Sequence, residues 1–166
     1  MIDAHASFTS DLADRHPGLV RGYASPFRSY GGRIAFHGPI HTVRCRESAG
    51  PIRACLAEPG MGRVLVADAG GTLRVAVLGD RMARLGADNG WAGVVIHGGI
   101  RDCVALRGLD FGVLALGSVP VRGELHGEGE TGVDLTIAGI LMRAGRHIYC
   151  DADGILVSDV ALSPDS

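Results

Sequence analysis

Runs of apolar residues alternate with short polar segments through the middle of the chain. Four runs are bounded by glycines or polar residues, which is typical of buried strands. These expected strands span residues 63–69, 72–79, 92–99 and 111–118. Between them, residues 80–89 predict a helix with Asp80 as its N-cap and Gly90 as its stop, and residues 101–108 predict a short helix or turn. This order predicts crossover connections and therefore an α/β fold.

Weaker helical patterns precede this central region. Residues 9–16 predict a short helix that is capped by Thr9 or Ser10 and stopped by Pro17. Residues 51–58 predict a second helix, because a proline stands at its first position and a glycine lies beyond its end.

The remaining segments have the character of loops and short strands. Residues 18–31 are loop-like, and residues 33–37 and 40–45 predict two strands that are broken at Gly38-Pro39. In residues 133–158, short apolar runs are separated by turn residues, which predicts an antiparallel meander. We therefore expect one α/β domain with a mixed sheet that is partly barrel-like in its C-terminal part.

The composition narrows the possible functions. The chain has 166 residues, which suits a single domain, and 16 basic against 18 acidic residues give a formal net charge of −2. Direct binding to nucleic acid through bulk charge is not expected, because it needs a basic face. No apolar run approaches the ~18 residues of a membrane span, and the first residues lack the blocks of a signal peptide. We expect a cytoplasmic protein with no membrane partner, whose mild hydrophobicity favours further burial in an oligomer.

The cysteines and histidines do not predict a metal centre of their own. A chain of this length builds a core without disulfides, so we expect four reduced cysteines that serve as packing residues. The cysteines, none in zinc-ligand spacing, are Cys45, Cys55, Cys103 and Cys150. His37 and His41 flank Gly38-Pro39 and cannot share a helix face, and no H-E-x-x-H occurs among the seven histidines. A zinc site is therefore not expected.

Several other motifs favour structural interpretations. Residues 127–132 match G-x-G-x-x-G, yet a strand follows them and their glutamates would repel a pyrophosphate, so we interpret them as a loop. Residues 151–154 resemble half of a calcium loop but favour a hairpin turn, because the other ligands are missing. His97 ends a buried strand and is interpreted as a hydrogen-bonded structural histidine. The serine elbow of hydrolases and the P-loop are both absent from the sequence.

The strongest candidate site combines two segments that follow strands. Gly79–Met82 and Gly98–Asp102 each end an expected strand and begin a helix. In α/β sheets, ligands collect at the carboxyl ends of strands and near helix N-termini. The carboxylates of Asp80 and Asp102 suit a hard divalent cation, and the guanidinium of Arg101 suits the carboxylate of a 2-oxo acid. A helix cap with an Arg–Asp surface pair is the alternative explanation.

These residues carry a resemblance to a known family. Residues 79–102, GDRMARLGADNGWAGVVIHGGIRD, resemble the RraA-like family, and the likeness extends over nearly the whole chain. The other matching stretches are residues 31–45, 62–71, 106–117 and 149–158. The family includes RraA-type inhibitors of ribonuclease E and class II 4-hydroxy-4-methyl-2-oxoglutarate aldolases, and members were once labelled demethylmenaquinone methyltransferases. The aldolase branch has an Asp, twenty intervening residues and then Arg-Asp, which is the spacing of Asp80 and Arg101-Asp102.

The resemblance implies a fold and a role for each residue. The fold is a swivelling β/β/α-type single domain over residues 1–166, assembled as a homotrimer or a dimer of trimers. Asp102 would hold the divalent metal, Mg²⁺ or Mn²⁺, partly through water. Arg101 would bind the pyruvate moiety of a small 2-oxo acid and stabilise its enolate, and Asp80 would position a metal-bound water for proton transfer. The backbone of the segment Gly79-Asp80-Arg81-Met82 would contact the substrate carboxylate.

The implied activity is that of a metal-dependent carbon–carbon lyase. It would cleave 4-hydroxy-4-methyl-2-oxoglutarate or 4-carboxy-4-hydroxy-2-oxoadipate to pyruvate and a second oxo acid, and would decarboxylate oxaloacetate. Both reactions pass through a pyruvate enolate, which a cation and a guanidinium stabilise. A Schiff-base aldolase is excluded, because the chain contains no lysine.

The chain departs from the longer aldolases in one respect, and an alternative function stays open. Those aldolases add a glutamate near the metal from the C-terminal region of a neighbouring subunit, whereas the last glutamate here is Glu130. The alternative is a non-catalytic RraA-type regulator that binds ribonuclease E or a helicase. RraA inhibitors have Gln at the position of Asp102, so this aspartate favours the lyase. A methyltransferase is a third interpretation, which the context of residues 127–132 opposes.

Overall fold

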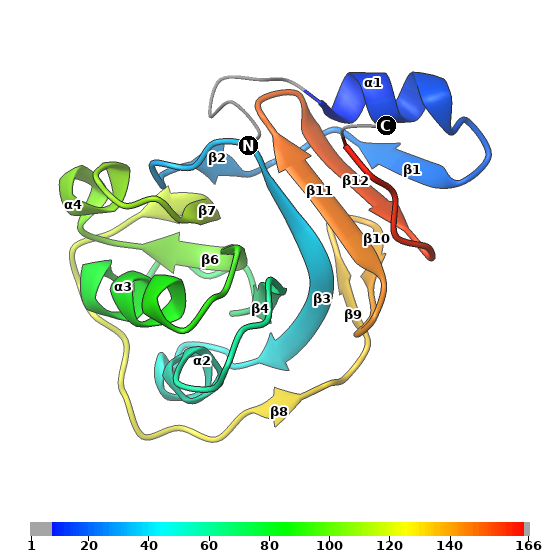
Figure 1. Cartoon of the computed structure of the whole chain (residues 1–166). Helices are drawn as coiled ribbons and strands as arrows, with labels where there is room; N and C mark the ends of the chain where they lie inside the picture. Colours follow the sequence, from blue (N-terminus) through cyan, green and yellow to red (C-terminus); the bar gives the residue numbers. More distant parts are fainter. Residues whose placement is uncertain (1–7, 165–166) are drawn as a thin grey trace.

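A computed structural model of the chain describes residues 8–164, and its central region follows the expected order of strands and helices. Figure 1 shows the arrangement of the elements. The helices are α1 (Thr9–Arg15), α2 (Gly50–Leu56), α3 (Asp80–Asp88) and α4 (Cys103–Arg107). The strands are β1 (Val20–Tyr23), β2 (Arg28–Ser29), β3 (Phe36–Arg44), β4 (Val64–Asp68), β5 (Ala76–Leu78), β6 (Gly93–Ile100), β7 (Gly112–Ser118), β8 (Glu130–Thr131), β9 (Leu135–Ile137), β10 (Ile140–Met142), β11 (His147–Asp151) and β12 (Gly154–Ser158). Within residues 8–164, no helix is long and apolar enough to cross a membrane.

Most of the strands belong to one large mixed sheet. Its order is β1-β12-β11-β3-β4-β6-β7-β2, with β5 also paired to β6 and β8 to β3, while β9 and β10 form a separate two-stranded sheet. Strands β3, β4, β6 and β7 are parallel, and β11, β12 and β1 add antiparallel pairs. In Figure 1 the long, curved β3 lies between the half that carries α2, α3 and α4 and the half made by β11, β12 and β1. The expected α/β fold with a mixed, partly barrel-like sheet is confirmed.

Both faces of the central parallel strands are buried, which explains their continuous apolar sequences. Successive side chains of a strand point to opposite faces. Leu65 and Ile96 lie in a core cluster with residues of α2, α3 and α4, whereas their neighbours Val66 and Val95 lie in a second cluster. The β9–β10 hairpin contributes Leu135, Ile137, Ile140 and Met142 to that second cluster. The hairpin therefore covers the sheet face that the helices leave open.

The continuous strand β3 replaces the two strands that were predicted around Gly38-Pro39. Strand β3 pairs with β11 as far as Pro39 and with β4 from Ile40 onward, so it changes partners at the proline. The missing N–H of Pro39 is tolerated at this point. A Cβ at Gly38 would collide with the carbonyl oxygen of Gly62, so the glycine permits a close backbone approach. The predicted break is therefore wrong.

Residues 18–31 contain two short strands rather than the expected loop. β1 pairs with β12, with Val20 opposite Ser158, and β2 pairs with β7, with Arg28 opposite Ala115. Both strands stand at the ends of the sheet order, and most of their residues are partly or fully exposed. Such short edge strands bury no complete face, so they lack the alternation of apolar and polar residues that identifies longer strands.

Helix α1 has the expected extent but not the expected cap. Phe8 occupies the N-cap position, and neither Thr9 nor Ser10 caps the helix. Instead, the buried carboxylate of Asp151 accepts the N–H groups of Phe8 and Thr9 and the hydroxyl of Thr9, each at 2.8 Å. A carboxylate from β11 thus satisfies the orphan donors at the start of α1.

The C-terminal strands form two hairpins rather than one meander. β9 pairs with β10, and β11 pairs with β12, but β11 also lies beside β3 in the large sheet. The expected hairpin turn at residues 151–154 is confirmed, because β11 ends at Asp151 and β12 begins at Gly154. A local sequence pattern predicts hairpins but does not indicate which distant strand they join. The prediction of an antiparallel meander is therefore only partly correct.

Candidate active site

Two paired parallel strands end together and bring the candidate residues into one place. In the pairing of β5 with β6, Leu78 lies opposite Ile100. The segments Gly79-Asp80 and Arg101-Asp102 follow these strands directly. The N–H of Arg101 donates to the carbonyl oxygen of Leu78 at 3.0 Å, which fixes the two segments to each other. This is the carboxyl edge of the parallel strands, where ligands of α/β sheets bind.

Asp102 has an uncommon backbone conformation that directs its carboxylate to the start of α3. Its φ of 64° and ψ of 42° lie in the left-handed region, which Asp tolerates better than most residues. Its Oδ2 accepts the N–H of Asp80 at 3.1 Å. Helix α3 begins at Asp80, and Gly79 is the N-cap, so the prediction of Asp80 as the N-cap is wrong by one residue. The carboxylate of Asp102 takes the place of a local cap.

Gly79 leaves the space that this carboxylate occupies. Its φ of −135° and ψ of −169° are open to any residue, so its backbone conformation does not require glycine. A Cβ at this position would lie 2.6 Å from Oδ2 of Asp102, whereas ordinary van der Waals contacts begin at 3.4 Å. The missing side chain of Gly79 therefore allows the Asp102 carboxylate to lie against the first turn of α3.

Among the residues that the structure describes, the two carboxylates of the site form only long ion pairs. Oδ2 of Asp102 lies 4.0 Å from Nε of Arg101, and Oδ2 of Asp80 lies 3.9 Å from Nε of Arg84. About a third of each aspartate side chain is exposed, so water weakens both pairs. The carboxylate oxygens therefore keep the capacity to bind a cation or to orient water.

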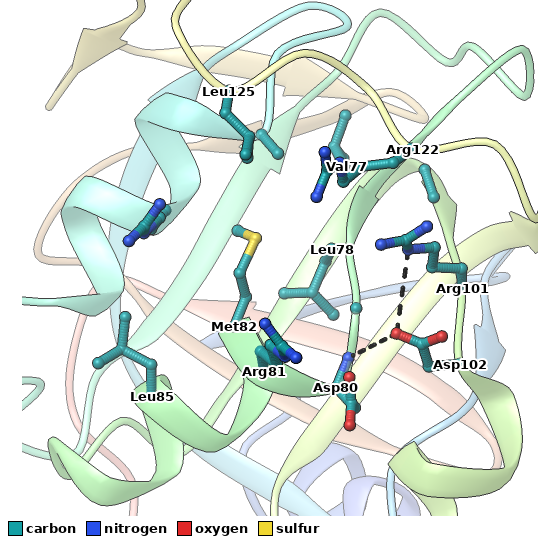
Figure 2. A pocket seen from close by; sticks show the side chains of 14 residues that line it. Val77, Leu78, Asp80, Arg81, Met82, Leu85, Arg101, Asp102, Arg122 and Leu125 are labelled. Carbon is teal, nitrogen blue, oxygen red and sulfur yellow. Dashed lines mark hydrogen bonds and ion pairs between the residues drawn. The ribbon is translucent and has the colours of Figure 1, made fainter.

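The predicted residues line an open cavity of about 710 Å³. Figure 2 shows Asp80, Arg81, Met82, Arg101 and Asp102 around it, with dashed lines from Asp102 to Asp80 and Arg101. Gly79 lines the same cavity, so the structure brings together every residue singled out in the sequence for substrate or metal. The N–H groups of Arg81 and Met82, in the first turn of α3, have no hydrogen-bond partner within residues 8–164. Such free N–H groups bind anions, carboxylates included.

Two arginines that were not singled out from the sequence also line the cavity. Arg53 comes from α2, and Arg122 comes from the segment after β7. Arg122 follows a parallel strand at the same sheet edge as Arg101, so the rule that located Arg101 could have found it. No pattern in the sequence indicates that Arg53 would reach this cavity.

The donor set of the cavity fits a hard divalent cation that keeps much of its water. Asp80 and Asp102 supply carboxylate oxygens, and Mg²⁺ is usually bound through one or two carboxylates together with waters and substrate oxygens. Within residues 8–164 there is no group of three or more His, Cys, Asp or Glu residues that could enclose a metal ion. The residues present thus suit Mg²⁺ or Mn²⁺ better than a fully protein-ligated ion such as structural zinc.

The other motifs largely have the structural roles that were expected of them. No helix begins at the G-x-G-x-x-G segment, which agrees with the rejection of a nucleotide site, but residues 130 and 131 form the short strand β8 beside β3, so the loop interpretation is only partly correct. Nδ1 of His97 lies 3.1 Å from Oδ1 of Asp68, as expected for a hydrogen-bonded structural histidine. The ring of His37 stacks on that of Tyr149 with centroids 5.6 Å apart, and His5 lies outside the described residues.

The cysteines are free in the structure and mostly buried. Cys45, Cys55 and Cys150 are buried, and Cys103 is partly exposed. Burial raises the pKa of Cys45 to about 12 and that of Cys55 to about 11, and it also raises the pKa of Cys150. These three thiols remain protonated at neutral pH, which agrees with their interpretation as packing residues.

Comparisons with known proteins show which family the chain is similar to. A family profile described as RraA-like, Aldolase/RraA, matches residues 9–157. A relative from Alkalilimnicola ehrlichii, named "Putative 4-hydroxy-4-methyl-2-oxoglutarate aldolase", is 47% identical over 90% of this chain and 93% of its own length. The structure of the RNA-processing inhibitor RraA from Thermus thermophilis is similar with a TM-score of 0.90 and 39% identity, over 95% of this chain and 96% of that one. A structure from Geobacillus kaustophilus described as S-adenosylmethionine: 2-dimethylmenaquinone methyltransferase has a TM-score of 0.89 and 40% identity, over 93% of this chain and 96% of that one.

Proposed function

Because the chain belongs to the RraA-like family, we propose that it is a divalent-metal-dependent class II aldolase. Its substrates are 4-hydroxy-4-methyl-2-oxoglutarate or 4-carboxy-4-hydroxy-2-oxoadipate, which it cleaves to pyruvate and a second oxo acid. It also decarboxylates oxaloacetate through the same pyruvate enolate. Relatives named "Putative 4-hydroxy-4-methyl-2-oxoglutarate aldolase", 43% to 47% identical to this chain, support the lyase assignment.

One observation carries the proposal. Arg101, Asp80 and Asp102 line one cavity together with Arg81 and Met82, whose N–H groups have no hydrogen-bond partner within residues 8–164. A left-handed Asp102 costs conformational energy, and such strain is retained mainly where the surrounding structure or the function requires it. A helix cap alone does not explain this arrangement, because a capping side chain accepts the N–H of the second or third helical residue, and those N–H groups, of Arg81 and Met82, have no partner within residues 8–164.

Each residue has a defined task in the proposed reaction. The N–H groups of Arg81 and Met82 bind the substrate carboxylate next to the 2-oxo group. When the C3–C4 bond breaks, its electron pair remains on the pyruvate fragment as an enolate, and the guanidinium of Arg101 stabilises the charge that develops on the 2-oxo oxygen. A water molecule oriented by the carboxylate of Asp80 takes the proton of the C4 hydroxyl and afterwards protonates C3 of the enolate.

Asp102 is the residue that would hold the cation, in part through water molecules. The divalent metal, when bound, supplies positive charge beside the 2-oxo group. Asp102 keeps its orientation through the hydrogen bond from the N–H of Asp80, so the metal ligand and the start of the carboxylate-binding helix turn form one unit. Its partial exposure leaves room for the waters that Mg²⁺ and Mn²⁺ retain.

Pyruvate release from oxaloacetate by EDTA-treated protein tests the proposal. Activity should be absent after EDTA treatment and should return with Mg²⁺ or Mn²⁺, and Asp102→Ala should abolish the metal-dependent turnover. Asp88→Ala is the matched control, because Asp88 lies exposed in the last turn of α3 and outside the cavity. Metal-dependent turnover by Asp102→Ala at the wild-type rate would refute the assignment of this residue.

A non-catalytic regulator of ribonuclease E is the second candidate. The structural similarity to an RNA-processing inhibitor, at 39% identity, favours it. This function would use the protein surface and would not need Asp102. Inhibition of purified ribonuclease E that is equally strong with the wild type and with Asp102→Ala, combined with no turnover of any 2-oxo acid, would support the regulator and exclude the lyase.

A further inference from the structure

The candidate active site carries more positive charge than a monocarboxylate needs. Four guanidinium groups line the cavity, from Arg53, Arg81, Arg101 and Arg122, against the two carboxylates of Asp80 and Asp102, which leaves an excess of two positive charges. A bound divalent cation would increase this excess. The positive field therefore favours a ligand with more than one negative group.

Arg122 has no acidic partner of its own. Within residues 8–164, its side chain takes part in no ion pair and no side-chain hydrogen bond, whereas Arg101 lies at 4.0 Å from Asp102. An arginine fork in a cavity, without a carboxylate to bind, is suited to the carboxylate of a ligand.

The backbone of Arg122 is held in place beside β5. The N–H of Ala76 donates to the carbonyl oxygen of Val121 at 2.7 Å, and the N–H of Gly123 donates to the carbonyl oxygen of Ala76 at 2.8 Å. These two bonds flank Arg122 and tie it to the strand that ends at Leu78, next to the proposed binding turn. The backbone position of Arg122 is therefore fixed relative to β5.

Figure 2 shows how the two arginines are arranged. The guanidinium groups of Arg101 and Arg122 both extend from the same wall into the cavity, while Met82, Leu85 and Leu125 line the other side. A ligand whose 2-oxo group lies at Arg101 and whose first carboxylate lies at the start of α3 has its distal carbons within the same cavity. A cavity of about 710 Å³ is much larger than pyruvate needs and accommodates such a substrate.

We propose that Arg122 binds the carboxylate on C4 of the substrate and thereby makes the enzyme selective for 2-oxo acids that carry this second carboxylate. The proposal rests on the proposed function, because it assumes that Arg101 and Asp102 bind the pyruvate moiety. In retro-aldol cleavage the C4 carboxylate stays on the leaving oxo acid, so binding it holds the C3–C4 bond in place without opposing its cleavage. A site built to pair a charged group rejects an analogue that lacks that group.

Two substrates that differ in one group test this proposal. 4-Hydroxy-4-methyl-2-oxoglutarate has a carboxylate on C4, and 4-hydroxy-2-oxopentanoate has a hydrogen in its place. We expect Arg122→Gln to lower kcat/KM for the first substrate about 10- to 100-fold, mainly through KM, and to change that for the second less than about twofold. Arg122→Lys should recover part of the loss, because it restores the charge without the planar fork. Arg21→Gln, which removes an exposed arginine of β1, is the matched control.

Exchange of the pyruvate methyl protons with deuterium, followed by NMR, reports on the enolate site alone. Arg122→Gln should exchange these protons at the wild-type rate and unfold at the wild-type temperature. Equal loss for both aldol substrates, or an unchanged ratio of their kcat/KM values, would overturn the role of Arg122 while the proposed function stands. A wild-type protein that neither cleaves the substrates nor exchanges the protons would overturn both.

Discussion

The contact between Gly79 and Asp102 leads to a prediction about a single methyl group. In Gly79→Ala the new Cβ would lie 2.6 Å from Oδ2 of Asp102, so the carboxylate must retreat by about 0.8 Å to reach an ordinary contact of 3.4 Å. This movement lengthens the 3.1 Å hydrogen bond from the N–H of Asp80 and shifts the proposed metal ligand. Misplacement of a catalytic group by about 1 Å costs about 10²-fold in rate, which corresponds to about 2.7 kcal/mol of transition-state stabilisation.

The assay is Mg²⁺-dependent pyruvate formation from oxaloacetate, with thermal unfolding measured in parallel. Gly79→Ala should lose about 10²-fold in kcat/KM but less than about 1 kcal/mol in the free energy of unfolding, because the displaced carboxylate remains in contact with water. Gly108→Ala is the control, because Gly108 also flanks a helix, has a φ of −84°, and places a Cβ at an ordinary 3.5 Å from Ala105. Wild-type kcat/KM in Gly79→Ala, while Asp102→Ala is inactive, would refute the argument that Gly79 sets the position of this carboxylate.

Two further predictions concern stability and reactivity. Burial acts to raise the pKa of Asp151, but hydrogen bonds from Thr9, Asp153 and Phe8 outweigh it and hold the pKa below its ordinary value of 3.8. Asp151→Asn should therefore lower the free energy of unfolding by about 1.5–3 kcal/mol in urea titrations at neutral pH. The difference between the two proteins should shrink as the pH falls below 3.8, because Asp151 of the unfolded wild type gains a proton there, whereas in the folded protein it stays ionised until its own lower pKa is reached; an equal difference at low pH would contradict this. Iodoacetamide at about pH 8 should label the native protein only at Cys103, as read by mass spectrometry, because the other three thiols are buried and have raised pKa values; early labelling of Cys45, Cys55 or Cys150 would show that these sites open readily.

The central part of the fold could be predicted because it buries strands on both faces. β4, β6 and β7 are continuous apolar runs between glycines and short helices. Each of these strands can therefore be predicted from its local sequence alone. β1, β2 and β8 were missed because they are short and largely exposed. The place of β11 beside β3 was also missed, since no local pattern encodes pairing between residues more than a hundred positions apart.

The candidate site was predictable where a topological rule applied. Asp80 and Arg101-Asp102 follow adjacent strands, and the rule that ligands bind at carboxyl edges brings them together. The left-handed conformation of Asp102 and the space left by Gly79 could not be predicted, because they depend on the contact between two segments. Arg122 reaches the cavity through hydrogen bonds between its neighbours and Ala76, which is a long-range pairing of the same kind.

The position of β3 has a consequence for the way the chain folds during synthesis. β3 leaves the ribosome early, yet one of its edges is completed only by β11, and β1 must wait for β12. The units around β4, β6 and β7 can fold as they emerge, because their partners are close in sequence. The second core cluster, which includes residues of β9 to β12, closes last. Such non-local pairing slows folding, and the apolar face of β3 stays open to other nascent chains until the final hairpin arrives.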